Sequence, residues 1–363
     1  LSNLREQQGP RLLHVVTQKG RGLAPAERDP VGFHGVARNG VSQSVDTAKA
    51  SAKAPKPPSW TDAAADYLCQ KAAADPRIVA ITPAMVEGSG LKGFQARFPE
   101  RLFDVGIAEQ HAVTLAGGLA AEGLRPVVAI YSTFLQRAWD QVIHDIALQN
   151  LPVTFLVDRA GLVGPDGPTH AGSFDLALGM SVPNLAVAVP ADRRGLEAAM
   201  DWALTHDGPV LIRYPRDRCP DDLGGEMLGD EPMAPRLLRR GRSALVIGIG
   251  AMVERLMPVC EQLGATLVDL RWAKPLSLDT LVELAGEHDA IVTVEEGSRI
   301  GGVGSELLHA LAERGISRPG LRLGLDDRFI EHGSREECLA DSGLDSRSIS
   351  DTIAAFLDEM SAT

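Results

Sequence analysis

Glu109 has surroundings that favour chemistry. It lies in the run Phe103-Asp104-Val105-Gly106-Ile107-Ala108-Glu109-Gln110-His111, where a short apolar segment breaks at a glycine and passes into a helix of small residues. These neighbours predict a buried carboxyl group, and burial raises the pKa of a glutamate towards neutrality. Such a group can exchange a proton with a bound ligand. The alternative is a first-turn glutamate that only interacts favourably with the helix dipole.

Polar side chains follow several predicted strands of the same region, at the points where those strands end. They are Tyr131, Arg137, Asp158, Arg159, Arg213, Tyr214 and Arg216, and the apolar Phe134 lies on the turn between the first two. Ligands of open α/β sheets collect at the carboxyl ends of parallel strands. Arginines that converge on one rim of an acidic protein predict a phosphate or carboxylate ligand, held by paired hydrogen bonds. The alternative is that each arginine pairs with a nearby aspartate, such as Asp140, Asp158 or Asp217.

A restrained loop, Gly161-Leu162-Val163-Gly164-Pro165-Asp166-Gly167-Pro168-Thr169-His170, lies between two of these strand ends. Irregular loops of this kind often carry functional residues. The ordinary pKa of a histidine suits proton transfer, so His170 is a candidate proton carrier. His34 lies among glycines and is a second candidate. For either histidine the alternative is an ordinary surface residue.

Two glycine motifs near the C-terminus invite other readings. Gly248-Ile249-Gly250 follows a predicted strand, and Asp269 ends the next, as a dinucleotide site requires. Val253 occupies the third glycine position, which disfavours NAD binding. Gly301-Gly302-Val303-Gly304 precedes a helix and could hold an anion, although tight packing is the stronger interpretation.

These side chains need a scaffold, and strand–helix alternation from Ser59 onwards predicts one. We expect strands at 78–81, 103–105, 126–131, 153–157, 185–189 and 210–212, and later at 244–249, 267–270 and 290–294. We also expect a helix capped by the run that begins at Ser59, and a second helix over 135–147. The pattern predicts two consecutive doubly wound, mainly parallel α/β domains. We place them at 59–220 and 241–363, with linkers at 37–58 and 221–240. Residues 1–36, with a predicted buried strand at 12–17, are interpreted as the end of an upstream α/β domain.

Composition narrows the functional class. The chain has 363 residues and a formal net charge of −12, which argues against nucleic-acid or anionic-membrane binding. No apolar run approaches the ~20 residues of a membrane span. The four cysteines are scattered without a close pair, which favours a reducing, cytoplasmic setting.

Taken together, the motifs resemble the 1-deoxy-D-xylulose 5-phosphate synthases, thiamine diphosphate enzymes of the transketolase group. The resemblance rests on runs 103–111, 131–141, 158–164 and 166–170, and it continues at Lys19, Phe33-His34 and 294–297. It implies a pyrimidine-binding-type domain followed by a transketolase C-terminal-type domain. It also implies the condensation of pyruvate with D-glyceraldehyde 3-phosphate, with loss of CO2, by a homodimer. That reaction begins the non-mevalonate isoprenoid pathway and feeds thiamine and pyridoxal synthesis.

The resemblance also assigns roles to individual residues. Glu109 would hydrogen-bond the aminopyrimidine ring nitrogen of thiamine diphosphate, Phe134 would stack on that ring, and Ile107 and Lys19 would lie against the cofactor. The polar and phosphate-binding side of the acceptor site would be formed by Tyr131, Arg137, Arg159, Asp166 and Arg216. His170 and His34 would handle protons or contact carboxylates.

The sequence departs from the family in two places. Leu23 follows Gly22 where many synthases carry an aromatic residue near the cofactor. The Gly-Asp-Gly run and later Asn through which the family's upstream domain holds diphosphate and magnesium are missing from this sequence. We therefore expect no metal ligands in this chain, and expect the chain alone to be inactive. The alternatives are the β subunit of a thiamine-dependent 2-oxo-acid dehydrogenase component, or a non-catalytic assembly module.

Overall fold

The computed structural model describes residues 2–30, 33 and 58–362. Two compact units divide the chain, Leu1–Lys56 and Pro57–Thr363. In the first unit, helices α1 (Ser2–Arg5) and α2 (Ala24–Arg28) flank an extended segment that contains Leu12 and Val16. The strand predicted at 12–17 is wrong: these residues are exposed and form neither helix nor strand. A strand needs a neighbour for its backbone hydrogen bonds, and no described segment pairs with it.

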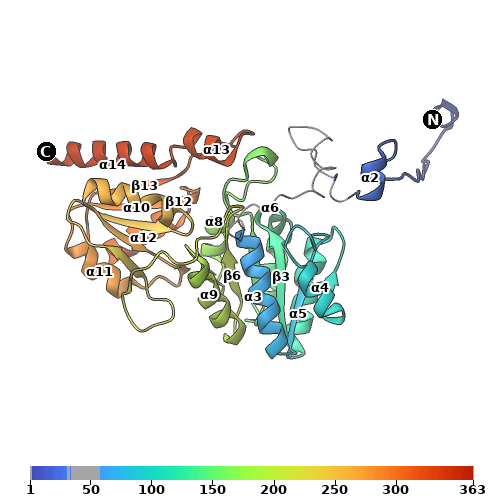
Figure 1. Ribbon diagram of the computed structural model, residues 1–363, viewed down its shortest axis with the longest axis horizontal. Coiled ribbons are helices and arrows are strands. Elements are labelled where there is room, and N and C mark those ends of the chain that lie inside the picture. The colour runs from blue at the N-terminus through green and yellow to red at the C-terminus, as the bar shows by residue number, and fades with distance from the viewer. Residues whose placement is uncertain (1, 31–32, 34–57, 363) are drawn as a thin grey trace, which may run out of the picture. The chain divides into compact units, whose positions relative to one another are not determined.

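The second unit contains a seven-stranded sheet in the order β11-β5-β6-β4-β3-β1-β2. Two of its strands, β3 and β6, are labelled in Figure 1. All neighbours are parallel except β11, which runs antiparallel to β5. The strands are β1 (Ile78–Thr82), β2 (Leu102–Asp104), β3 (Arg125–Tyr131), β4 (Thr154–Asp158), β5 (Ala186–Ala188), β6 (Val210–Arg213) and β11 (Trp272–Lys274). Tyr131 pairs with Asp158, and Val157 pairs with Arg213. This register brings the predicted polar strand ends to one edge of the sheet.

Helices cover both faces of this sheet. Val127 and Ala129 of β3 share a core with residues of α3 and α9, whereas Val128 and Ile130 share one with residues of α5. The helices are α3 (Trp60–Ala74), α4 (Lys92–Arg97), α5 (Glu109–Ala121), α8 (Asp175–Ser181) and α9 (Arg193–Thr205). Ser59 caps α3 in a reciprocal arrangement with Asp62, as its sequence predicts.

The predicted helix over 135–147 is interrupted. The chain passes through α6 (Ser132–Leu135), a 3₁₀ turn η3 (Gln136–Ala138), α7 (Trp139–Gln141) and a π-helical turn η4 (Val142–Ala147). A short 3₁₀ turn, η2 (Pro99–Arg101), leads into β2. Such tight or widened turns displace side chains from the regular helical positions. In η3 they place Arg137 at the carboxyl edge of the sheet.

A second, six-stranded sheet has the order β13-β12-β9-β10-β8-β7. Its strands are β7 (Glu226–Met227), β8 (Arg236–Arg239), β9 (Leu245–Ile249), β10 (Thr266–Asp269), β12 (Ile291–Ser298) and β13 (Gly320–Leu325). The four strands β13-β12-β9-β10 are parallel, and β8 and β7 add to the edge in antiparallel pairing. The segment 221–240, which we predicted to be an aperiodic linker, thus contains two short strands.

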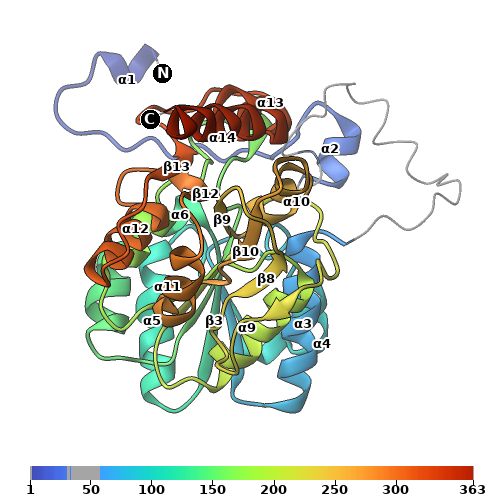
Figure 2. The same cartoon turned by 90° about the vertical axis from the view of Figure 1, so that its left-hand side faces the viewer.

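Five helices accompany this second sheet (Figure 2). They are α10 (Met252–Leu263), α11 (Leu278–Gly286), α12 (Val303–Glu313), α13 (Arg335–Asp341) and α14 (Ser346–Ser361). Leu256 and Ile353, from α10 and α14, share one core, and Leu281 and Leu307, from α11 and α12, share another. Alternate residues of β9 contribute to these two cores. The architecture is therefore two mainly parallel α/β sheets, as the strand–helix alternation predicts.

A buried ion-pair triad joins the two sheets. Arg236 of β8 donates to Asp192, the N-cap of α9, at 2.7 Å and to Asp269 of β10 at 2.9 Å. β11, which follows β10 in the chain, crosses over to pair with β5 of the first sheet. The second sheet is thereby attached to the first through both its backbone and its charges.

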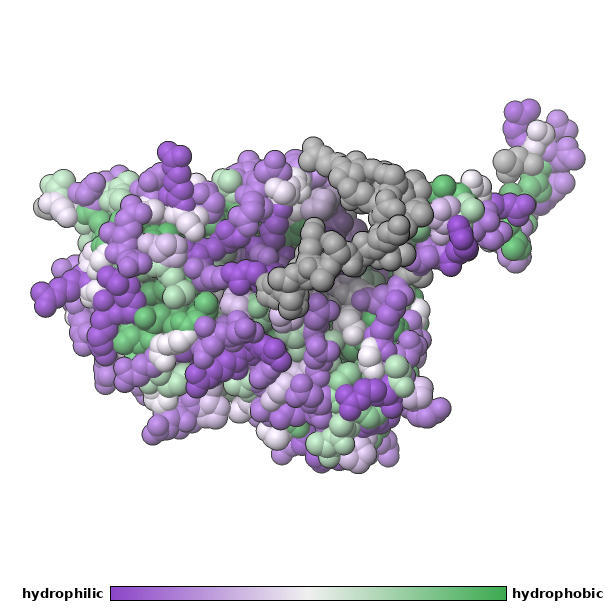
Figure 3. Space-filling view, in the orientation of Figure 1, coloured by the Kyte–Doolittle hydropathy of each residue, from purple (hydrophilic) through white to green (hydrophobic). Residues whose placement is uncertain are grey.

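All four cysteine thiols are free and buried: Cys69, Cys219, Cys260 and Cys338. Burial raises the pKa of Cys219 and of Cys260 to about 12. The face of the molecule in Figure 3 is mainly hydrophilic, with apolar residues in small patches. None of the described helices is long and apolar enough to cross a bilayer.

Candidate active site

Glu109 is the first residue of α5, and it is 4% exposed. The predicted burial is confirmed. The Nε atom of Arg137 lies 3.2 Å from Oε2 of Glu109, as an ion pair. That geometry is not a hydrogen bond, and Oε2 accepts none within the described part of the chain. A buried carboxylate oxygen in this state can accept a hydrogen bond from a ligand, because leaving it unsatisfied is costly.

Two arginines of the predicted rim converge on one carboxylate. Arg159 and Arg216 both donate to Oδ2 of Asp166, at 3.0 Å and 2.5 Å. Asp166 lies in the 3₁₀ turn η5 (Gly164–Asp166), and Arg216 is partly exposed. Both arginines therefore pair with an aspartate, as the alternative supposed, although the partner is Asp166 and not Asp140, Asp158 or Asp217. The result is a pair of guanidinium groups that face one anion position.

Three aromatic rings pack against one another beside these arginines. Tyr131 stacks on Phe134 with ring centroids 5.6 Å apart, and Phe134 meets the edge of His170 at 5.5 Å. The guanidinium of Arg159 lies over the Tyr131 ring, 4.0 Å from its centroid. Burial raises the pKa of Tyr131 to about 12, so its hydroxyl stays protonated. This cluster of rings places a hydroxyl and an imidazole beside the apolar Phe134 ring.

Hydrogen bonds hold the loop that carries His170. Thr133 donates to the Thr169 carbonyl oxygen at 2.9 Å, and the Thr169 hydroxyl lies 2.9 Å from Nδ1 of His170. These contacts join the turn that carries Phe134 to the loop that carries His170. Thr133 and Thr169 are positioning residues that the sequence patterns do not single out.

Asp158 and Arg213 belong to the frame of this edge. Thr61, on α3, donates to Asp158 at 2.7 Å, and burial raises the pKa of Asp158 to about 6. Arg213 is buried and donates to Asp175 at 3.0 Å and to the Glu296 carbonyl oxygen at 3.0 Å. Of the arginines at the strand ends, Arg213 is therefore committed to packing, and the partly exposed Arg137, Arg159 and Arg216 face outwards.

The other predicted site residues are placed as follows. Ile107 is 82% exposed at the turn before α5. Lys19 belongs to the first unit, and His34 lies outside the described residues, so their roles stay predictions. Within residues 2–30, 33 and 58–362, no group of three or more His, Cys, Asp or Glu side chains is arranged to hold a metal ion.

The two glycine motifs of the second sheet are filled by the chain itself. Asp269 is wholly buried and bound by Arg236, so its carboxylate cannot reach a ribose. At 301–304, the carboxylate of Glu295 accepts hydrogen bonds from the backbone N–H groups of Val303 and Gly304, at 3.0 Å and 2.9 Å. The helix N-terminus that could hold an anion already holds one, and the packing interpretation is confirmed.

Comparison with known proteins matches both domains. Residues 56–221 match the family model "Transketolase, pyrimidine binding domain", and residues 235–349 match "Transketolase, C-terminal domain". The 1-deoxy-D-xylulose-5-phosphate synthase of Thioalkalivibrio sulfidiphilus is 52% identical over 361 residues, covering 99% of this chain and 56% of that protein. The synthase of Methylococcus capsulatus is 49% identical over 363 residues, covering 100% of this chain and 56% of that protein. The chain thus spans a little over half the length of these relatives.

Solved structures give the same fold. A split-gene transketolase, described as an inactive β4 tetramer, has a TM-score of 0.72 at 29% identity, covering 82% of this chain and 97% of that one. Transketolase from Campylobacter jejuni has a TM-score of 0.70 at 17% identity, covering 83% and 47%. These matches do not favour the dehydrogenase β subunit or the assembly module. The chain therefore belongs to the transketolase group, as a pyrimidine-binding domain and a C-terminal domain that correspond to part of a 1-deoxy-D-xylulose-5-phosphate synthase.

Proposed function

We propose that this chain supplies the pyrimidine-binding and acceptor-binding parts of a 1-deoxy-D-xylulose 5-phosphate synthase. The reaction joins pyruvate to D-glyceraldehyde 3-phosphate with loss of CO2. The observation that carries the proposal is the buried Oε2 of Glu109, which accepts no hydrogen bond and lies at the same sheet edge as the cluster of aromatic rings and the paired arginines. A transferase of the transketolase type needs these features together.

The residues present fit the aminopyrimidine part of thiamine diphosphate. Its ring nitrogen would hydrogen-bond the Glu109 carboxyl group, accepting from the protonated acid and donating to the carboxylate once the proton has moved to the ring. Phe134, which is half-buried beside Tyr131, would contact the ring. When bound, this cofactor supplies a carbanion that can attack a keto group. The work of Glu109 is to hold or release a proton at the ring nitrogen, in surroundings that exclude water. Ile107 and Lys19 are proposed as further contacts with the cofactor.

The paired guanidinium groups fit the acceptor substrate. Arg159 and Arg216 now share the Asp166 carboxylate. A phosphate dianion offers more acceptor oxygens and more charge than one carboxylate, so it can compete for the same donors. Tyr131, with its protonated hydroxyl, and Arg137 complete the polar side. His170 and His34 are proposed to move protons on the acceptor, His170 from its position against the Phe134 ring.

Further parts of the proposal rest on the family alone. They are magnesium as the second cofactor, for which we assign no residue of this chain, a homodimer, and a place in isoprenoid and thiamine synthesis. We also propose that this chain alone does not turn over. The similar split-gene transketolase chain is described as inactive, and we expect the diphosphate of the cofactor to need another domain.

The test is an assay of 1-deoxy-D-xylulose 5-phosphate formation with thiamine diphosphate and Mg²⁺. The chain is assayed alone, and joined to the part of the Thioalkalivibrio sulfidiphilus synthase that it does not match. We expect no turnover by the chain alone and turnover by the joined protein. Normal turnover by the chain alone would refute the inactivity proposal.

In the joined protein, Glu109→Gln and Glu109→Ala should lower kcat on the order of 10²- to 10⁴-fold, the usual contribution of a positioned proton carrier. Glu122→Gln is the matched control, because Glu122 is exposed just beyond the other end of the same helix. Circular dichroism should show unchanged folding for all three variants. Full activity of both Glu109 variants would refute the proposal that Glu109 is the proton carrier of this site.

A further inference from the structure

The acceptor loop 159–172 is held from the second sheet by a carboxylate that none of the roles above uses. Glu296 lies on β12, and its side chain is 4% exposed. Its Oε1 accepts a hydrogen bond from the backbone N–H of Leu162 at 2.8 Å. Leu162 is itself buried, and it lies four residues before Asp166. The C-terminal domain thus bonds directly to the backbone of the loop that carries the anion-binding residues.

The glycines of this loop show how closely the C-terminal domain approaches it. A Cβ atom on Gly161 would lie 2.5 Å from Cδ of Glu296, and one on Gly164 would lie 2.8 Å from the backbone nitrogen of Arg335. Both glycines have positive φ, +80° and +72°, which residues with a side chain rarely adopt. The loop therefore packs directly against Glu296 and the backbone of Arg335, and a side chain at either glycine would collide with them.

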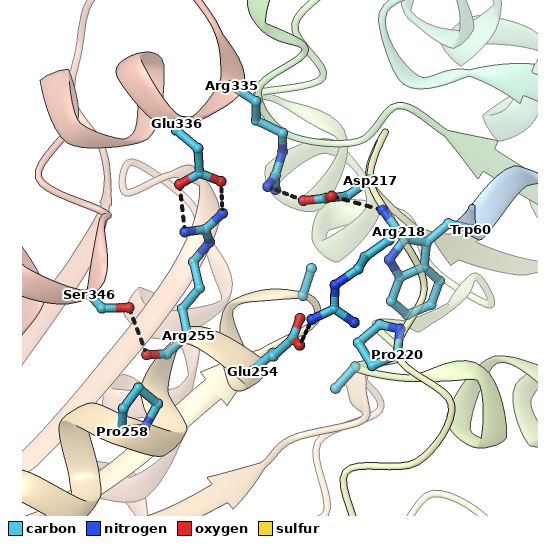
Figure 4. A pocket seen from close by; sticks show the side chains of 12 residues that line it. Trp60, Asp217, Arg218, Pro220, Glu254, Arg255, Pro258, Arg335, Glu336 and Ser346 are labelled. Carbon is cyan, nitrogen blue, oxygen red and sulfur yellow. Dashed lines mark hydrogen bonds and ion pairs between the residues drawn. The ribbon is translucent and has the colours of Figure 1, made fainter. Parts of the chain in front are cut away.

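Arg335, the first residue of α13, connects the two ends of the acceptor site. One guanidinium nitrogen forms an ion pair with Oε2 of Glu296, and the other donates to Asp217 at 2.7 Å. Asp217 directly follows Arg216 in the chain. Figure 4 shows Arg335 reaching from its helix towards Asp217; both residues line one side of a cavity of about 310 Å³ between the domains. Through one side chain, the loop before Asp166 and the segment after Arg216 are fixed to the same point.

The cavity itself does not call for a ligand. Its lining holds three arginines and three carboxylates, which pair as Arg218 with Glu254, Arg255 with Glu336 and Arg335 with Asp217. The charges balance, so no net field draws in an ion. Only Arg335 among these pairs also reaches the acceptor loop, through Glu296. The distinctive property of this region is that connection.

We propose that Glu296 and Arg335 are positioning residues for the acceptor site. Held by them, Asp166 keeps Arg159 and Arg216 close together, so that their guanidinium groups are positioned for a phosphate before substrate arrives. This inference rests on the proposed function for the identity of the acceptor, but the hold on the loop is independent of it. Neither residue touches substrate in this arrangement, so their removal should affect binding of the acceptor and not the chemistry at Glu109.

The first test uses the chain as it is, and needs no activity. Hydrogen–deuterium exchange is followed in peptides covering 160–168 for the unsubstituted chain, Glu296→Gln and Arg335→Lys. We expect exchange at the Leu162 amide to speed up on the order of tenfold in Arg335→Lys and in Glu296→Gln, since each loses a charged hydrogen bond. Unchanged exchange in both variants would overturn the proposal.

Arg255→Lys is the matched control. Arg255 lines the same cavity and forms its own ion pair with Glu336, but unlike Arg335 it forms no ion pair with Glu296, the residue that bonds the loop. Its variant should leave exchange in 160–168 unchanged. Equal acceleration in Arg255→Lys and Arg335→Lys would mean general loosening of the domain contact, and would refute a specific hold on the loop.

The second test separates positioning from plain stability in the joined protein. Arg335→Lys should raise KM for glyceraldehyde 3-phosphate on the order of tenfold, while KM for pyruvate changes less than about twofold. An equal rise for both substrates, or none, would contradict the proposal. Its failure is distinct from failure of the proposed function, because the latter is read from Glu109→Gln, whereas the exchange measurement involves no turnover.

Discussion

The polar groups at the carboxyl edges of the two mainly parallel sheets differ in whether the chain itself supplies their buried partners. At the edge of the first sheet, Glu109 keeps a buried oxygen without a hydrogen bond, and Arg159 and Arg216 meet at a partly exposed position. At the edge of the second sheet, Asp269 is bound by Arg236 and Glu295 occupies the N-terminus of α12. The same architecture offers ligand groups in one case and satisfies them internally in the other.

The comparison separates a site from a motif that only resembles one. Both edges carry acids, glycines and helix N-termini, as ligand-binding α/β folds do. What distinguishes them is whether those polar groups already have buried partners from the same chain. We therefore expect a ligand at the first edge. The ion pairs and hydrogen bonds at the second edge stabilise the fold that supports it.

The largest effect should come from breaking the buried triad. Arg236→Met leaves Asp192 and Asp269 facing each other without their cation, and removal of one partner from a buried ion pair costs about 3–5 kcal/mol. The free energy of unfolding, from denaturant titration, measures it. Arg314→Met is the control, because Arg314 pairs with Asp279 at the exposed surface, away from the triad; it should change the free energy of unfolding by less than about 1 kcal/mol. A loss below about 1 kcal/mol in Arg236→Met would contradict the holding role of this edge.

The second effect depends on pH. The pKa of Asp158 is about 6 in the folded chain against 3.8 for an ordinary aspartate, so between these values the folded state binds more protons than the unfolded state. Stability from this group is therefore lost as the pH rises from about 4 to 6. Asp158→Asn does not titrate, so its stability relative to the unsubstituted chain should rise by on the order of 2–3 kcal/mol between pH 4 and 7. Parallel pH–stability curves would disprove this.

The smallest effect on stability should come from the open edge. Asp166→Asn removes the carboxylate that Arg159 and Arg216 share, but all three groups are partly exposed. The free energy of unfolding should therefore change by less than about 1 kcal/mol. The same denaturant titration measures it beside Arg236→Met. A loss comparable to that of Arg236→Met would erase the distinction between the two edges.

The sequence patterns anticipated what depends on neighbours along the chain. The cap at Ser59, the burial of Glu109 and the polar strand ends beyond Tyr131 and Asp158 are all local, because strand alternation and helix signals extend over a few residues. The parallel register of β3 and β4 then brings the strand ends together. The residues of the candidate rim are therefore predictable from the sequence alone.

Contacts between distant segments could not be anticipated in this way. Arg216 finds Asp166 fifty residues earlier in the chain, and Glu296 bonds Leu162 across 134 positions. β11 and β8 are too short for a periodic signal, yet one completes the first sheet and the other carries Arg236. Tertiary packing decides which of several nearby acidic residues an arginine pairs with. Residue spacing in the sequence does not reveal that packing.

The buried cysteines have a practical consequence for experiments on this molecule. Thiols react with maleimides as thiolates, and burial both shields Cys219 and Cys260 and raises their pKa to about 12. The folded chain should therefore leave such dyes unreacted at neutral pH. A single cysteine introduced at the exposed Pro165 would then be the one accessible thiol, and a fluorophore there could report movement of the loop without any background to remove.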